Sequence, residues 1–215
     1  MKATTKERFC ELAGSAAIVP VYREIPGDMD TPVSVLKRFA DDDLAVLLES
    51  VEGGENLGRY SFLGVNPYGV FFVQDHVPYT RIGGIERKLP YAGNPLNALR
   101  DIIGNGKVAV EPDLPPLPGG AIGFLSYEAS GLFESLPAPK GSSGVPECLF
   151  MLTDEIIAFD NRRHTIKVIV NVHTDHHQTL DGAFEGAQNR LDRLESKIRQ
   201  PSGPHETPRG ASPVE

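Results

Sequence analysis

Two apolar runs of strand length, separated by a pair of glycines, stand out early in the chain. Residues 44–51 form the first run, Gly53 and Gly54 follow it, and Tyr60 to Leu63 begin the second run. Apolar runs of this length are typical of buried strands, and glycine adopts the positive φ that a tight reversal needs. We therefore expect a buried β-hairpin, around which the rest of the chain supplies further strands of a sheet.

Two polar side chains, Glu49 and Ser50, lie near the end of the first apolar run. Because side chains alternate along a strand, Ser50 shares a face with Leu48 and Glu49 faces the other way with Leu47. A buried carboxylate or hydroxyl without a partner costs about 1–3 kcal/mol. A hydroxyl among aliphatic groups, such as that of Ser50, suits one polar contact in an apolar pocket. A polar residue beside a glycine turn is, however, more often exposed to solvent without a binding role.

The rest of the chain alternates strand-forming runs with a few helical patterns. Capping residues followed by apolar residues at helical spacing predict helices over 4–12, 31–39, 94–104 and 175–198. Apolar runs bounded by turn residues predict strands over 16–23, 69–74, 79–82, 85–89, 119–127, 149–159 and 165–172. Most successive strands are joined by short turns. The expected fold class is α+β, with one curved, mostly antiparallel sheet of about seven to nine strands and helices packed on one face.

The charge, the apolar runs and the cysteines of the chain argue against several classes of protein. The net charge of −8 and the scattering of the 21 lysines and arginines argue against nucleic-acid binding. Apolar runs are shorter than the roughly 18 residues that a membrane span requires, and the start of the chain lacks the apolar region of a signal peptide. We therefore expect a cytoplasmic protein. Cys10 and Cys148 lie far apart between apolar neighbours, which favours buried reduced thiols over a disulfide.

The end of the chain differs in character from the rest. Four prolines with Ser, Gly, Glu and Thr make up most of residues 200–215. Such a segment is too poor in apolar residues to build a core. We expect one domain over 1–199 and a disordered linker or tail over 200–215.

The polar clusters of the sequence do not form a recognisable catalytic or metal site. His173, His176 and His177 lie where a helix begins, without a second group of ligands at a useful spacing. Asp154 and Glu155 are expected on opposite faces of one strand, and Asp160 at the head of a turn. No catalytic residue, cofactor site or metal ligand is therefore predicted for this chain.

Two blocks of sequence carry a family resemblance. Residues 47–64, with Leu47, Leu48, Glu49 and Ser50 at their start, resemble the amino-terminal signature of anthranilate synthase component I, an enzyme of the chorismate-utilising family. Residues 119–128 followed by 133–137 are similar to the second block of that family. The resemblance covers nearly all of residues 4–199, and it implies half of the architecture of anthranilate synthase component I.

The resemblance also implies a role in feedback control of tryptophan biosynthesis. In that family the Leu-Leu-Glu-Ser strand lines the pocket for the inhibitor L-tryptophan. By this resemblance Ser50 contacts the bound tryptophan, Glu49 meets its ammonium group and Arg59 its carboxylate. Chorismate and Mg²⁺ are held by the carboxy-terminal half, whose motifs do not occur here. The chain alone is expected to be inactive, with that catalytic half and a glutamine amidotransferase subunit as its partners.

Two other interpretations remain open from the sequence. One is the amino-terminal part of aminodeoxychorismate synthase, which shares the fold but not the feedback by tryptophan. The other is a free-standing regulatory or interaction protein that keeps the fold. If the catalytic half is missing, the chain is expected to expose an apolar face of several hundred Å² or to pair with a partner.

Overall fold

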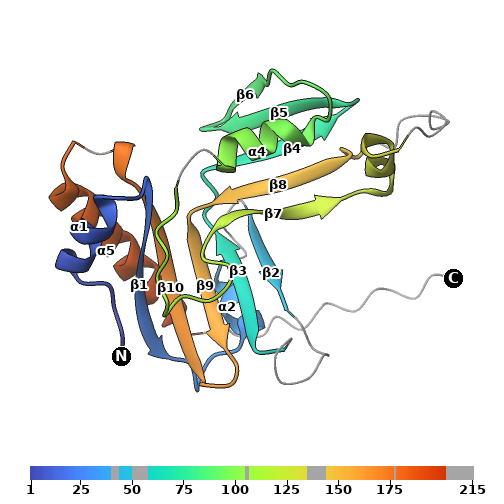
Figure 1. Ribbon diagram of the computed structural model, residues 1–215. Coiled ribbons are helices and arrows are strands. Elements are labelled where there is room, and N and C mark those ends of the chain that lie inside the picture. Colours follow the sequence, from blue (N-terminus) through green and yellow to red (C-terminus); the bar gives the residue numbers. More distant parts are fainter. Residues whose placement is uncertain (40–43, 50–57, 105–106, 135–143, 177, 202–215) are drawn as a thin grey trace, which may run out of the picture.

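The computed structural model describes residues 1–39, 44–49, 58–104, 107–134, 144–176 and 178–201 (Figure 1). Within them, ten strands form two five-stranded sheets in which all neighbours are antiparallel. The first sheet has the order β1 (Ile18–Pro26), β10 (Thr165–His173), β9 (Glu155–Asp160), β3 (Tyr60–Val65) and β2 (Ala45–Leu48). The second has the order β6 (Ile85–Lys88), β5 (Val77–Ile82), β4 (Gly69–Gln74), β8 (Cys148–Thr153) and β7 (Gly120–Leu125). The predicted α+β class with antiparallel pairing is confirmed.

Three helices cover one face of the first sheet: α1 (Lys6–Ala13), α2 (Pro32–Arg38) and α5 (Leu180–Ile198) (Figure 1). The helix α5 presents a buried stripe at helical spacing, as predicted, which comprises Ala183, Ala187, Leu191, Leu194 and Ile198. It begins at Leu180 rather than near Asp175, because the side chain of Thr179 accepts a hydrogen bond from the Gly182 amide and so caps it. The short helix η2 (Thr174–His176) fills the gap between β10 and this cap.

The second sheet has its own core, and a third cluster joins the two sheets. The helix α4 (Leu96–Gly104) packs Ala98 and Leu99 against β4 and β8. Ile122 of β7 packs instead with Ile156 and Ile169 of the first sheet. The short helix η1 (Tyr127–Leu132) follows β7 directly.

The run over 149–159 is not one strand. It divides at Asp154, where the chain leaves β8 in the second sheet and enters β9 in the first. The hydroxyl oxygen of Thr153 lies 3.0 Å from the carbonyl oxygens of both Val65 and Glu155, which fixes this corner. The single sheet that we expected is therefore two sheets, linked here and between β3 and β4.

Two predicted strand pairings and one predicted helix can also be compared with the structure. The hairpin of β5 and β6 is confirmed, with positive φ at Gly83 and Gly84 as a tight turn requires. The pairing of β2 with β3 is also confirmed, but β2 is a half-buried edge strand rather than a buried one. The helix α2 forms within the predicted range 31–39, and it buries Val35 while Val33 is exposed.

At the ends of the chain we predicted a helix that begins at residue 4 and a tail over 200–215. The cap of α1 is Thr5, because the Thr4 hydroxyl is buried and accepts a hydrogen bond from the Tyr22 amide. The predicted tail lies outside the described residues from position 202 onward. Among the residues that the structure describes, no helix is long and apolar enough to cross a membrane.

Candidate functional site

Two of the predicted effector residues are described: Glu49, which directly follows β2 at the edge of the first sheet, and Arg59, which directly precedes β3. Val46 packs toward the cluster between the sheets, and Leu47 toward the helices. Leu48 is 41% exposed, and Glu49 directly after it is exposed too. Ser50 lies outside the described residues, so its predicted contact stays a prediction. Because Leu48 pairs with Phe62, the end of β2 lies near the start of β3, which Arg59 directly precedes.

Arg59 is held by a carboxylate that no sequence pattern pairs with it. Its Nη2 lies 2.7 Å from Oδ2 of Asp160, and its Nε lies 3.2 Å from Oδ1. The guanidinium also lies over the ring of Tyr60, 4.7 Å from the centroid. The pairing follows from the register, because Tyr60 of β3 faces Asp160 of β9 across the sheet. Among the described residues, the side-chain hydrogen bonds of Arg59 go from Nε and Nη2 to Asp160.

The environment of Asp160 shifts its ionisation. Burial alone would raise the pKa of this carboxyl group, but hydrogen bonds from Arg59 and from the amides of Arg162 and Arg163 outweigh it and lower the pKa. The same hydrogen bond raises the pKa of the Arg59 guanidinium. Both groups are therefore charged at neutral pH, and a ligand carboxylate would meet an already neutralised arginine.

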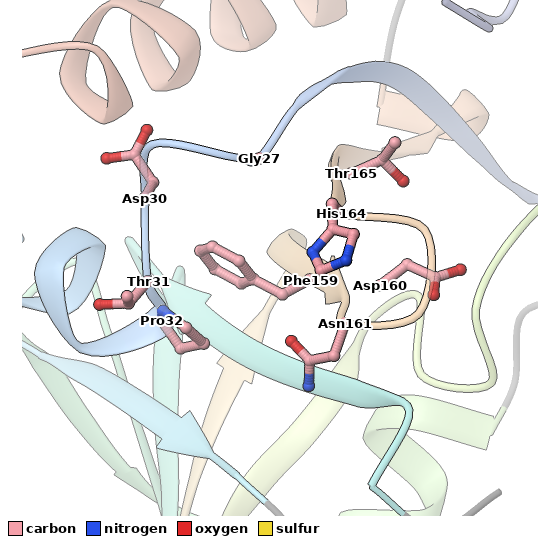
Figure 2. Close-up of a pocket in the computed structure, with 9 residues that line it drawn as sticks. All are labelled: Gly27, Asp30, Thr31, Pro32, Phe159, Asp160, Asn161, His164 and Thr165. Carbon is pink, nitrogen blue, oxygen red and sulfur yellow. The ribbon is translucent and has the colours of Figure 1, made fainter. Parts of the chain in front are cut away.

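A cavity of about 230 Å³ lies beside this ion pair (Figure 2). It is lined by Gly27, Asp30, Thr31, Pro32, Phe159, Asp160, Asn161, His164 and Thr165. Figure 2 shows the Phe159 ring between the Thr31–Pro32 side of the lining and His164. Its volume is below the roughly 300–1,000 Å³ of typical ligand sites. Its carboxylates are bound internally, Asp160 by Arg59 and Asp30 by Arg38, so we assign it no ligand.

The carboxylates that the sequence singled out do not form an acid–base pair. Asp154 contacts His173 at the corner between the sheets. Glu155 is bound by Arg190 of α5, with 2.6 Å between Oε1 and Nε, and by the amide of Asn66. Each of these carboxylates has a structural partner, and none faces another across a cleft.

Comparison with known proteins agrees with the resemblance seen in the sequence. No family model matches the chain. It is 38% identical over 185 residues to an anthranilate synthase component 1 from Acetivibrio thermocellus, which covers 84% of this chain and 36% of the relative. An anthranilate synthase component 1 from Pseudomonas aeruginosa is 32% identical over 206 residues, which is 93% of this chain and 40% of the relative.

The chain belongs to the anthranilate synthase component 1 family. The crystal structure of anthranilate synthase component I from Streptococcus pneumoniae superposes with a TM-score of 0.55 at 25% identity, over 84% of this chain and 37% of that one. The matched part of the family proteins is the amino-terminal part. The chain therefore spans well under half the length of these component 1 relatives.

The sequence analysis did not predict the ion pair between Arg59 and Asp160. Asp160 was expected only as the head of a turn, yet it anchors Arg59 from 101 positions away. The available signal was the register of the antiparallel hairpins, which brings the start of β3 level with the end of β9. That register depends on the break at Asp154, which the apolar pattern conceals.

Proposed function

We propose that the chain is the effector-binding part of an anthranilate synthase component 1 and that its effector is L-tryptophan. The observation that carries this proposal is the match with component 1 relatives, at 38% identity over 84% of the chain for Acetivibrio thermocellus. The described residues offer paired structural carboxylates rather than a catalytic group, which favours binding over chemistry in this part of the protein. Formation of anthranilate from chorismate, with Mg²⁺, then belongs to the catalytic region that the relatives possess in addition.

In this proposal the tryptophan site is the edge of β2. Leu44 and Leu48 are exposed there, at 40% and 41%, and supply apolar surface for an indole ring. Ser50 contacts the ligand, the exposed carboxylate of Glu49 meets the ammonium group, and Arg59 meets the carboxylate. An edge strand leaves this half-site open on one side, so residues of the catalytic region complete it.

The catalytic region is proposed to dock on the second sheet, at β7. This strand is a free edge of its sheet, and it carries Phe124 and Leu125 with exposures of 45% and 50%. Tyr127, at the start of η1 two residues after Leu125, is 91% exposed. An edge strand with exposed apolar side chains favours pairing with another strand. A glutamine amidotransferase subunit is the further partner that the family assignment suggests.

Feedback in this scheme is a coupling between two sites. Tryptophan at β2 favours a state with a lower affinity for chorismate, and chorismate lowers the affinity for tryptophan by the same factor. The free chain, with an incomplete half-site, binds tryptophan weakly.

The test joins this chain to the part of the Acetivibrio thermocellus relative that lies outside the aligned 36%. Anthranilate formation is followed by its fluorescence at increasing tryptophan concentrations. The proposal predicts inhibition by tryptophan and little effect of phenylalanine at equal concentration. Full activity at saturating tryptophan would favour the aminodeoxychorismate or free-standing alternatives instead.

A further inference from the structure

A cluster of histidine and aspartate side chains lies where β10 passes into η2, remote from the β2 edge. The possible ligand atoms of His173, Asp175 and His176 all lie within 4.8 Å of one another. The two imidazole rings are stacked, with centroids 5.1 Å apart and planes inclined by 11°. Two imidazoles and a carboxylate form a donor set that Zn²⁺ and its neighbours in the transition series bind well.

Asp154 lies beside this cluster and contacts His173, from which it is 19 positions away in the sequence. This residue is the link between β8 and β9, and its backbone carbonyl accepts a hydrogen bond of 2.8 Å from the Asn171 amide. Its Oδ1 lies 3.1 Å from Nε2 of His173. A carboxylate that holds one nitrogen of a histidine fixes the ring and its tautomer and leaves the other nitrogen to bind the metal, as at many metal sites.

His173 is also the least exposed member of the cluster. Its side chain is 25% exposed, and the ring of Tyr68 packs against it edge-on at 6.3 Å. The side chains of Asp175 and His176 are 71% and 69% exposed. The cluster therefore combines one oriented ligand with two that can move.

The geometry points to a binding site for a divalent transition-metal ion of the zinc class, with His173, Asp175 and His176 as ligands and Asp154 as the group that orients His173. Tetrahedral coordination at about 2.1 Å places ligand atoms roughly 3.4 Å apart. Asp175 and His176 have to close by about an ångström, and the stacked His176 ring has to turn, which their exposure permits. Water takes the fourth position.

The bound ion would fasten η2 to the end of β10, immediately before the cap of α5 at Thr179. Because the ion binds the folded chain through residues from β10 and η2, it should stabilise the fold as its concentration rises. This site is independent of the proposed tryptophan site, and neither result decides the other.

The experiment titrates the full chain with ZnCl₂ by calorimetry, at a pH well above the ordinary histidine pKa of about 6.5. Melting curves with and without Zn²⁺ give a second readout. We expect one ion per chain and a higher melting temperature in Zn²⁺. His173→Ala and His176→Ala should each weaken binding by more than about tenfold, and Asp154→Asn by about 10–100-fold, as is usual for an orienting partner.

The matched control is His164→Asn, which removes an imidazole from the turn between β9 and β10. His164 has φ of 52°, a conformation that asparagine tolerates. This variant should bind Zn²⁺ like the parent chain. His176 is exposed, so loss of binding in His176→Ala cannot be ascribed to loss of core packing. Equal affinity of the parent, His173→Ala and His176→Ala, or no uptake at millimolar Zn²⁺, would overturn the proposal.

Discussion

Arg59 and Asp160 join two strands of the first sheet through a two-point ion pair, with Nη2 to Oδ2 at 2.7 Å and Nε to Oδ1 at 3.2 Å. The Asp160 side chain is only 7% exposed. Two parallel hydrogen bonds to one carboxylate make such a pair stronger and more directional than an ordinary surface ion pair. The pair therefore contributes both to stability and to the position of Arg59 directly before β3.

Replacing Arg59 by leucine should destabilise the chain in a pH-dependent way. The pKa of Asp160 is lowered in the folded state, so its contribution is present above the ordinary aspartate pKa of about 4 and is lost as the pH falls through the lower, folded value. Urea unfolding should show a deficit for Arg59→Leu at neutral pH that narrows below about pH 4. Arg81→Leu, which breaks the exposed pair with Glu86, is the control and should change stability by less than about 1 kcal/mol at either pH.

Gly123 allows β7 and β8 to approach each other closely. A Cβ atom at this position would lie 1.9 Å from the carbonyl oxygen of Leu149, so the backbone would have to move. We expect Gly123→Ala to lower the free energy of unfolding by more than about 2 kcal/mol. Gly186→Ala is the matched control, because a Cβ there meets nothing within 4 Å outside its own helix and should raise stability by about 0.5–1 kcal/mol. Equal urea midpoints for the two variants would contradict the role given to Gly123.

Local patterns predicted local structure well in this chain. The strand β4 was expected over its observed bounds, and the hairpin at Gly83 and Gly84 follows from the backbone freedom of glycine. The break at Asp154 could not be predicted, because an apolar run indicates a buried strand without indicating which sheet it joins. The pairs of Arg59 with Asp160 and of His173 with Asp154 could not be predicted for the same reason, because both depend on that break.

The two cysteines should differ in reactivity. Burial raises the pKa of the Cys148 thiol to about 11, whereas Cys10 on α1 is partly exposed. Thiolates are the reactive form, so at about pH 8 a thiol reagent should modify Cys10 in the folded chain and Cys148 only after unfolding. Counting labelled thiols by mass spectrometry, before and after adding guanidinium chloride, checks this. Labelling of the folded Cys10→Ser variant at the rate of the parent chain would contradict it.

The predicted role of Ser50 can be tested by adding bulk. In the chain completed with the catalytic region of the Acetivibrio thermocellus relative, Ser50→Phe should fill the proposed pocket and raise the tryptophan concentration needed for half inhibition by more than about tenfold. Activity without tryptophan should change little, because Ser50 is not a catalytic residue in this proposal. Val33→Phe, which adds similar bulk at an exposed position of α2, is the control. Coincident inhibition curves for Ser50→Phe and the parent enzyme would remove Ser50 from the site.

The two free edges of the second sheet allow a matched test of the proposed docking surface. Leu125 on β7 and Ile85 on β6 are both exposed, at 50% and 59%, but it is β7 that we propose as the docking edge. A lysine on an edge strand opposes pairing with another strand. With the catalytic region supplied as a separate chain, Leu125→Lys should weaken association by about tenfold or more, while Ile85→Lys leaves it unchanged. Because each substitution lies on an exposed edge, both variants should keep the unfolding midpoint of the parent chain. Equal weakening by the two lysines would mean that charge, and not the β7 surface, governs the association.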